Sequence, residues 1–240
     1  MTNEELVILI PAYNEGPRIG SVLDVVCSYK REKRIIVIDD GSNDDTAKCA
    51  QQYPVELLQH TQNRGKGAAL QTAIDYVKHA SYWLFLDADL INLRHEHMDA
   101  LLEPLRIDPK IGMTIGMFQK GGKLSVDLAQ RFFAILNGQR GLSGKFVETL
   151  PNLSWTRFGV EIFLSRVAQH QGVPIAMPIL RGITHHTKES KLGFVPGFRY
   201  RLQMYRECIY ALMNWHRFIP LPSNTEVCSN NNKVEFEEKR

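Results

Sequence analysis

The sequence predicts an α/β fold with a mainly parallel central sheet. Short apolar runs rich in β-branched residues alternate with segments whose apolar residues recur at helical spacing. Turn residues and carboxylates directly follow several of those runs, as expected at the carboxyl ends of parallel strands. The chain has 240 residues, of which 44% are hydrophobic, so one large domain can bury a sizeable core.

The first half of the chain alternates strands with helices. We expect strands at Leu6–Ile10, Arg34–Ile38, Val55–Leu58 and Tyr82–Leu86. We expect helices at Arg18–Tyr29, Asp45–Gln52 and Ala68–Lys78. Because a helix connects each strand to the next, neighbouring strands should be parallel.

The second half is less regular. We expect helices at Met98–Arg106 and Leu128–Leu136 and from Phe158 to about Gln169, and strands at Ile111–Phe118 and Val173–Leu180. Two segments are expected to be loops: the glycine-rich residues 137–144, and residues 183–191, which are dense in metal-capable and cationic side chains. An acceptor-binding part of the protein should be built here.

A basic amphipathic helix is predicted over Phe198–Trp215. One face carries Phe198, Leu202, Tyr205, Ile209, Leu212 and Met213, and positive charge comes from Arg199, Arg201, Arg206 and Arg217. We favour a helix that packs on the preceding domain with a solvated basic face, over one that contacts a membrane surface or lipid phosphate. The expected organisation is a domain over residues 1–195, with halves 1–120 and 121–195, then this helix within 196–222 and a polar tail over 223–240.

Composition excludes several classes of protein. A net charge of +3 without a basic cluster or a nucleic-acid-reading motif argues against a nucleic-acid partner. The four cysteines show no metal-binding spacing, which fits a reduced intracellular chain. The N-terminus lacks the features of a signal peptide, and no run of 18 apolar residues is present. We therefore expect a cytoplasmic protein without a membrane span.

The sequence Asp87-Ala88-Asp89 is the main candidate site. It follows the apolar run Tyr82–Leu86, so the two carboxylates should lie at the carboxyl end of a buried strand. Paired carboxylate oxygens suit Mg2+ or Mn2+ shared with a substrate diphosphate. The alternative is a solvated turn or a helix N-cap.

Neither common phosphate-binding loop is present. The first strand is not followed by G-x-G-x-x-G, and no G-x-x-x-x-G-K-[ST] occurs. A nucleotide would instead need a carboxylate for its ribose or base, Arg64 and Lys66 for its charge, and a metal on Asp87 and Asp89 for its diphosphate.

Four motifs follow one another along the chain: Ile10-Pro11-Ala12-Tyr13-Asn14-Glu15, Val37-Ile38-Asp39-Asp40-Gly41-Ser42, Asn63-Arg64-Gly65-Lys66-Gly67 and Asp87-Ala88-Asp89-Leu90. In this order they resemble the motifs of family-2 glycosyltransferases with a GT-A fold, a Rossmann-like three-layer sandwich that binds nucleotide sugars. The branch that contains dolichol-phosphate mannosyltransferases is the most similar. The resemblance is close over about the first 120 residues and looser as far as His185 and Lys191.

The resemblance implies a role for individual residues. The nucleotide-sugar pocket would comprise Pro11, Ala12, Tyr13, Glu15, Asp40, Lys66, Asp87 and Ala88, with Asp40 on the nucleobase and Lys66 near the phosphates. The metal ligands would be Asp87, Asp89 and His185, although His186 competes with His185, and a surface histidine without a ligand role is an alternative.

Catalytic roles would fall to Asp89, Glu161 and Lys188. Glu161 is either a general base or an acid that stabilises the start of its helix. Lys188 and Lys191, with Arg140, would bind an acceptor phosphate or serve as ordinary surface charge. An anionic acceptor needs no base.

The expected function is metal-dependent transfer of a hexose from a UDP- or GDP-sugar to a lipid phosphate or other acceptor, with inversion favoured by the resemblance. A polyprenyl phosphate acceptor would place the protein peripherally on the cytoplasmic face of a membrane. The alternatives are a non-catalytic nucleotide-sugar-binding or scaffold protein and a nucleotidylyltransferase, although the latter ordinarily has a Gly-rich motif with Arg and Lys after its first strand. Donor sugar, base and oligomeric state stay open.

Overall fold

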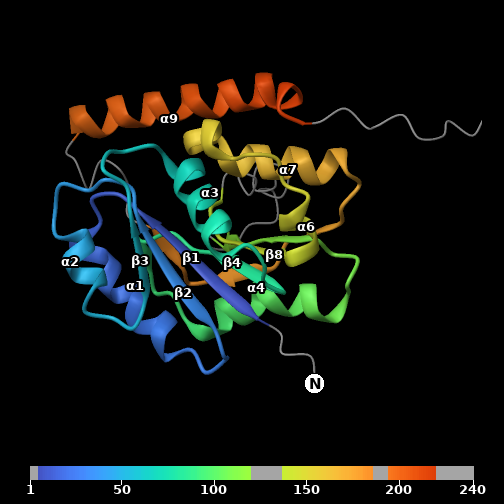
Figure 1. Cartoon of the computed structure of the whole chain (residues 1–240), viewed down its shortest axis with the longest axis horizontal. Coiled ribbons are helices and arrows are strands. Elements are labelled where there is room, and N and C mark those ends of the chain that lie inside the picture. Colours follow the sequence, from blue (N-terminus) through green and yellow to red (C-terminus); the bar gives the residue numbers. More distant parts are fainter. Residues whose placement is uncertain (1–4, 120–136, 186–193, 220–240) are drawn as a thin grey trace, which may run out of the picture.

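A seven-stranded sheet forms the centre of the molecule, in a computed structural model that describes residues 5–119, 137–185 and 194–219 (Figure 1). The strand order is β3-β2-β1-β4-β8-β6-β9. The bounds are β1 Leu6–Ala12, β2 Arg34–Asp39, β3 Glu56–Gln59, β4 Tyr82–Phe85, β6 Met113–Ile115, β8 Arg140–Ser143 and β9 Ile175–Ala176. Within this sheet β8 pairs antiparallel with both neighbours, and the other pairs are parallel. The predicted α/β fold with a mainly parallel sheet is confirmed.

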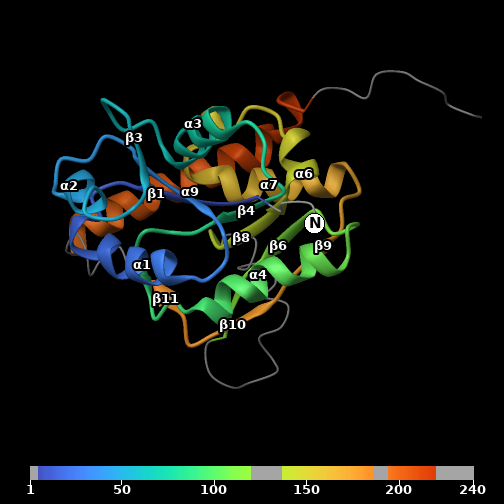
Figure 2. The ribbon, with the colours of Figure 1, turned by 60° about the horizontal axis from the view of Figure 1, so that its bottom comes forward.

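Helices cover both faces of the sheet (Figures 1 and 2). One face packs against α1 (Gly16–Ser28), α2 (Thr46–Ala50) and α4 (His95–Ile107), and the other against α3 (Lys66–Val77), α6 (Gly144–Glu148) and α7 (Val160–His170). Side chains of β1 alternate between the two cores: Ile8 and Ile10 enter the first, and Val7 and Leu9 the second. Because both faces are buried, this strand is continuously apolar.

The predicted glycine-rich loop over residues 137–144 was wrong, because part of it is β8. The strand pairs with β4 and β6 in the middle of the sheet. A side chain at Gly141 would come within 2.6 Å of the Thr114 hydroxyl and 2.7 Å of the Leu101 carbonyl oxygen. Glycine is therefore needed at position 141 for close packing against α4. Because glycine has a low β propensity, the sequence pattern did not indicate a strand here.

Two predicted strands are each divided. Residues 111–118 form β6 and then β7 (Met117–Gln119), and residues 173–180 form β9 and then the start of β10 (Ile179–Arg181). β7 and β10 pair with each other outside the main sheet, and β5 (Leu90–Ile91) pairs with β11 (Thr184–His185). Pro178 interrupts the second segment, since proline cannot donate to a strand ladder. The predicted helix Leu128–Leu136 lies outside the described residues.

Helix α9 (Phe194–Asn214) lies outside the three layers, against α7 and the 3-10 helix η2 (Ser154–Gly159), and ends at η3 (Trp215–Arg217) (Figures 1 and 2). The predicted C-terminal helix is confirmed, with an earlier start. Cys208 and Ala211 are buried against the protein, and a side chain at Gly159 would come within 2.3 Å of Ala211 Cβ. Small residues thus allow the close contact between the two helices.

The solvent-facing side of α9 is more apolar than we expected. The helix packs on the preceding domain and Arg206 and Arg217 are exposed, as predicted, but Leu202, Ile209 and Met213 are also exposed, by 61%, 56% and 68%. Helical periodicity shows which residues share a face but not which face meets the protein. Among the described helices, none is long and apolar enough to cross a bilayer.

Candidate functional site

Residues that were predicted to bind a nucleotide sugar follow three parallel strands at one edge of the sheet. β2, β1 and β4 are adjacent and parallel, so their carboxyl ends lie together. Tyr13 follows β1, Asp40 follows β2, and Asp87 lies two residues beyond the end of β4. The structure therefore brings together the residues that were predicted to bind a nucleotide sugar.

The side chain of Lys66 joins two carboxylates from distant parts of the chain. Lys66 is the first residue of α3, and its Nζ lies 2.5 Å from Asp87 Oδ1 and 2.6 Å from Glu161 Oε1. Burial opposes the charge of Lys66, but the two carboxylates outweigh it and hold its pKa above the usual value. Lys66 is thus a firmly protonated cation at the end of β4.

Gln139 fixes the other side of Asp87. Its Nε2 donates to Asp87 Oδ2 at 2.9 Å, and its Oε1 accepts from the Asp87 backbone N–H at 3.2 Å. Gln139 is fully buried. Gln139 was not among the predicted site residues, because it lies in the segment that was expected to be a loop. Its place next to the end of β4 follows from the pairing of β8 with β4.

Gly138 lies directly over this ion pair. A Cβ at this position would come within 2.5 Å of both Asp87 Oδ2 and Lys66 Nζ. Only the absence of a side chain lets the backbone approach so closely. The carboxylate of Asp87 is therefore enclosed by Lys66, Gln139 and the Gly138 backbone.

Arg140 lies inside the protein, which differs from its predicted contact with an acceptor phosphate. It is 1% exposed, and its guanidinium donates to the Asn137 and Glu161 carbonyl oxygens and the Ser165 hydroxyl. Burial lowers the pKa of Arg140 to about 10, although the charges of Glu161 and Asp87 oppose the shift. Arg140 supports the turn at the start of α7 and is not a surface cation.

The donor atoms at the end of β4 suit a hard divalent cation. Asp87 and the nearly buried Asp89 supply carboxylate oxygens, the ligands that Mg2+ and Mn2+ prefer. The register of β11 on β5 sets His185 opposite Leu90, next to Asp89, although the side chain of His185 is not described. No group of three His, Cys, Asp or Glu residues forms a metal site within the described ranges. His186, Lys188 and Lys191 lie outside them.

The loop that carries Lys66 is held by Asp40. The Asp40 carboxylate accepts hydrogen bonds from the Arg64 and Gly65 backbone N–H groups, at 2.9 and 2.7 Å, and lies 2.6 Å from His60 Nδ1. It is buried, so its oxygens are directed into the loop. Contact of Asp40 with a nucleobase stays a prediction.

The first strand ends in a turn fixed by the neighbouring loop. Asn14 has a left-handed backbone, with φ 55°, and its N–H donates to the Ser42 hydroxyl. Glu15 is buried: its N–H donates to the Thr46 hydroxyl, and its carboxylate accepts from Arg18 at 3.1 Å. Pro11, Ala12 and Tyr13 lie at the same edge, and their contact with a nucleotide sugar stays a prediction.

Helix α9 is connected to the Lys66 loop through Arg157. Glu207 of α9 accepts a 2.9 Å hydrogen bond from Arg157 Nε and a 3.3 Å bond from the Phe158 N–H. Arg157 Nη2 in turn lies 3.4 Å from Asn63 Oδ1, and the backbone of Arg157 contacts Gly65, which has φ 93°. The C-terminal helix therefore supports the segment just before Lys66.

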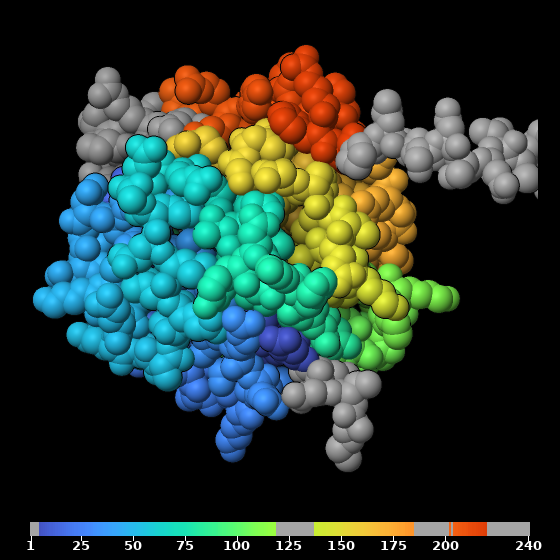
Figure 3. Space-filling view, viewed as in Figure 1, coloured from blue at the N-terminus to red at the C-terminus, as the bar shows by residue number. Residues whose placement is uncertain are grey.

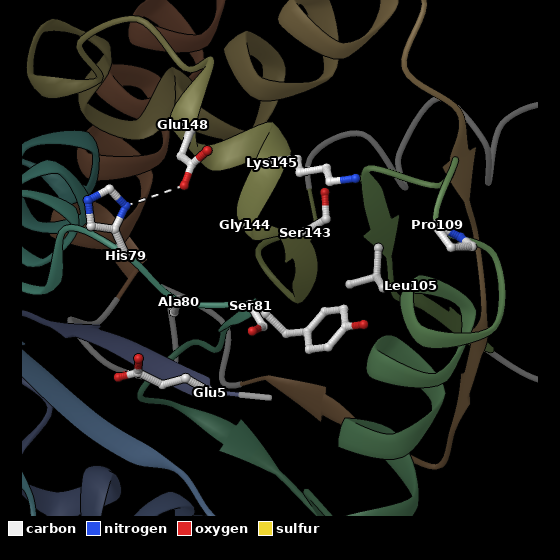
Figure 4. Close-up of a pocket in the computed structure, with 11 residues that line it drawn as sticks. Glu5, His79, Ala80, Ser81, Leu105, Pro109, Ser143, Gly144, Lys145 and Glu148 are labelled. Carbon is white, nitrogen blue, oxygen red and sulfur yellow. Dashed lines mark hydrogen bonds and ion pairs between the residues drawn. The ribbon is translucent and has the colours of Figure 1, made fainter. Parts of the chain in front are cut away.

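A hollow of about 560 Å3 lies at the opposite edge of the sheet (Figure 4). Its lining includes Glu5 and Tyr82, at the amino ends of β1 and β4, together with Lys145 and the hydrogen-bonded pair His79 and Glu148. These residues are remote along β4 from Asp87. Volume therefore does not locate the candidate site, whereas the grouping of charged residues does.

The family profile described as "Glycosyl transferase family 2" matches residues 7–153, which is more than half of the chain. A dolichyl-phosphate beta-glucosyltransferase of Dictyostelium discoideum is 39% identical over 103 residues, covering 36% of this chain and 31% of that protein. The human protein of that name is 35% identical over 102 residues, with the same coverage. Each match thus spans less than a third of the relative.

Solved structures share the fold over most of the chain. Glucosyl-3-phosphoglycerate synthase of Mycobacterium tuberculosis, in complex with Mn2+, UDP and glucosyl-3-phosphoglycerate, has a TM-score of 0.71 and 24% identity. The similarity covers 91% of this chain and 82% of that one. The same enzyme was also solved with Mg2+ and UDP. This likeness establishes the GT-A fold.

Proposed function

Because the chain belongs to glycosyl transferase family 2, we propose that it transfers a hexose from a UDP- or GDP-sugar to a lipid phosphate, with Mg2+ or Mn2+. The observation that carries the proposal is the position of Asp87 and Asp89 at the carboxyl end of β4, with Lys66 ion-paired to Asp87 and Glu161. Two similar relatives named dolichyl-phosphate beta-glucosyltransferase support a lipid phosphate as the acceptor.

The departing nucleoside diphosphate needs compensation for its growing negative charge. Asp87, Asp89 and, in our proposal, His185 would hold the cation, which supplies that stabilisation when bound. Lys66 carries its positive charge at the same carboxylate, so it is placed to donate to a diphosphate oxygen. The hydrogen bond from Gln139 to Asp87 would keep this carboxylate oriented while Lys66 donates to the diphosphate.

The acceptor determines whether a base is required. A hydroxyl acceptor gains from a carboxylate that removes its proton, whereas a phosphate is already an anion. The carboxylate of Glu161 is engaged by Lys66. We therefore assign Glu161 the role of holding Lys66. Lys188, predicted from the sequence alone, stays the candidate for binding the acceptor phosphate. Inversion follows if the acceptor phosphate displaces the diphosphate directly.

A polyprenyl phosphate lies in a membrane, so the protein would act peripherally at its cytoplasmic face. The nucleotide-sugar donor is water-soluble and would be taken from the aqueous side. This location is part of the proposal and depends on the choice of acceptor.

Donor binding gives the first test. The melting temperature is measured with UDP-, GDP-, ADP- and dTDP-sugars, with Mn2+ or EDTA, because a ligand at 100 times its Kd stabilises the folded state by about 2.7 kcal/mol. We expect a shift with one nucleotide that needs the metal and disappears in Asp89→Ala. Asp75→Ala, which removes an exposed carboxylate of α3, is the matched control and should keep the shift. No shift with any donor would favour a scaffold protein.

A further inference from the structure

Helix α9 carries a row of large apolar side chains that the rest of the described structure leaves exposed. Leu202, Ile209 and Met213 are spaced by seven and four residues, so they follow one line along the helix. Tyr205 and Tyr210 flank this line and are about half exposed. Figure 3 shows the side chains of α9 along the upper edge of the molecule. The ring of Tyr210 also packs edge-on against Trp155 of η2, so we call Leu202, Tyr205, Arg206, Ile209 and Met213 the outer α9 face.

The contacts of α9 with the rest of the protein are made by its inner side. Cys208 and Ala211 are buried, and Glu207 is ion-paired with Arg157. The outer α9 face is therefore not required to hold the helix on the protein. Contiguous exposed apolar surface on a folded protein commonly marks a site of interaction.

The described charge of the outer α9 face is positive. Arg206 is exposed within this face, and Arg217 is exposed in η3, just after α9 in the chain. From Leu202 to Ile219 the sequence has a single acidic residue, Glu207, which lies on the inner side. A second copy of the same face would offer no carboxylate to Arg206, whereas anionic lipid head groups complement it.

We propose that the outer α9 face binds the surface of an anionic lipid bilayer, with the helix lying in the plane of the interface. The apolar line would enter the boundary of the acyl chains, and Tyr205 suits the head-group level, where amphipathic rings are favoured. The role of this membrane binding rests on the proposed function. Because Glu207 of α9 binds Arg157, which contacts Gly65, membrane-bound α9 would hold the loop before Lys66 near the membrane that contains the acceptor.

Vesicle binding tests the inference directly. The full chain is sedimented with vesicles of phosphatidylcholine alone and with vesicles that contain phosphatidylglycerol. We expect binding to the anionic vesicles, a decrease of at least about 10-fold in Ile209→Asp because an apolar contact is replaced by a charge, and a decrease of about 5-fold or more in Arg206→Glu. Salt should weaken the wild-type binding.

Two variants control for nonspecific effects of the new charges. Ile107 is 78% exposed on α4, which lies on the far side of the molecule from α9, so Ile107→Asp should bind as wild type (Figure 1). Lys110→Glu, also at an exposed position, matches Arg206→Glu. Equal losses in these controls, or no binding of the wild type, would overturn the inference. The inference would also be overturned if the wild type were a dimer that does not bind vesicles and Ile209→Asp were a monomer.

The acceptor separates this inference from the proposed function. With a short, water-soluble polyprenyl phosphate and no vesicles, Ile209→Asp should transfer sugar as fast as the wild type; with a long-chain acceptor in vesicles it should be slower. If the wild type binds vesicles but transfers sugar to neither acceptor, the proposed function fails and the inference about α9 stands. If the wild type transfers sugar to the soluble acceptor but does not bind vesicles, the inference about α9 fails and the proposed function stands.

Discussion

Glu207 accepts a hydrogen bond from the side chain of Arg157, whose backbone has φ 49° and ψ −117°, a conformation that residues other than glycine rarely adopt. The same carboxylate accepts the N–H of the next residue, Phe158, so one acid of α9 fixes two consecutive residues of the segment that leads into α7. Arg157 also contacts Gly65, the residue before Lys66. The helix at the C-terminus is thus part of the structure that positions Lys66.

Replacing Glu207 should destabilise the protein. Glu207→Ala leaves the Phe158 N–H without this acceptor and releases Arg157, and we expect a loss of about 1–2 kcal/mol in the free energy of unfolding, measured with urea. Glu96→Ala removes the carboxylate of an exposed pair with Arg94 and should change the stability by less than about 0.5 kcal/mol. Equal effects in the two variants would show that Glu207 is an ordinary surface acid.

The thiol of Cys208 should report whether α9 is docked. Burial, together with the charges of Glu161 and Glu207, raises the pKa of Cys208 to about 11. Because the thiolate is the reactive form, alkylation of Cys208 at pH 8 should be slower in the native protein than in urea, on the order of 100-fold. Peptide mass spectrometry gives the rate for this cysteine. Rapid native labelling would mean that α9 leaves the protein readily.

Gln139 should tune the metal affinity through Asp87. In Gln139→Ala the carboxylate loses one of its donors, and we expect activity to need about 10- to 100-fold more Mn2+, as is typical when a residue that orients a metal ligand is removed. The measurement is initial rate against Mn2+ concentration. Gln169→Ala, on the exposed end of α7, should leave this dependence unchanged. An unaltered metal requirement in Gln139→Ala would exclude this role.

Glu161 distinguishes the two classes of acceptor chemistry. If Glu161 holds Lys66 and the acceptor is a phosphate, Glu161→Gln should lower kcat by less than about 10-fold, because no proton has to be removed. A general base would instead account for about 10²- to 10⁴-fold. Rates from pH 5 to 9 decide the matter, since loss of a base also removes the acidic limb of the profile. A large loss of kcat would contradict the phosphate acceptor.

Local patterns in the sequence were sufficient to predict the first half of the fold. β1 and β2 are continuous apolar runs because both of their faces are buried, and this property is visible in a short window. Asp87 and Asp89 were placed at a strand end for the same reason. The positions of β8 and Gln139 depend on pairing with a strand more than 50 residues away, which no short window contains.

The outward direction of the apolar side of α9 had a different cause. The sequence identifies the residues that share a side of the helix, but the closest approach to the protein is made at Gly159 and Ala211, whose small size carries little hydrophobic signal. The pairing of Lys66 with Glu161 also joins residues far apart in the chain. Such contacts follow from tertiary structure, whereas the motifs that carry the chemistry are local.

Sugar transfer by wild type and Asp89→Ala, measured with Mn2+ and a short-chain polyprenyl phosphate, tests the central claim most directly. The donor is the nucleotide sugar that raises the melting temperature. We predict a glycosylated lipid phosphate with the wild type and Asp75→Ala, no product with EDTA, and a loss of at least about 100-fold in Asp89→Ala. Unchanged product formation in EDTA or in Asp89→Ala would contradict a metal-dependent transferase site at the end of β4.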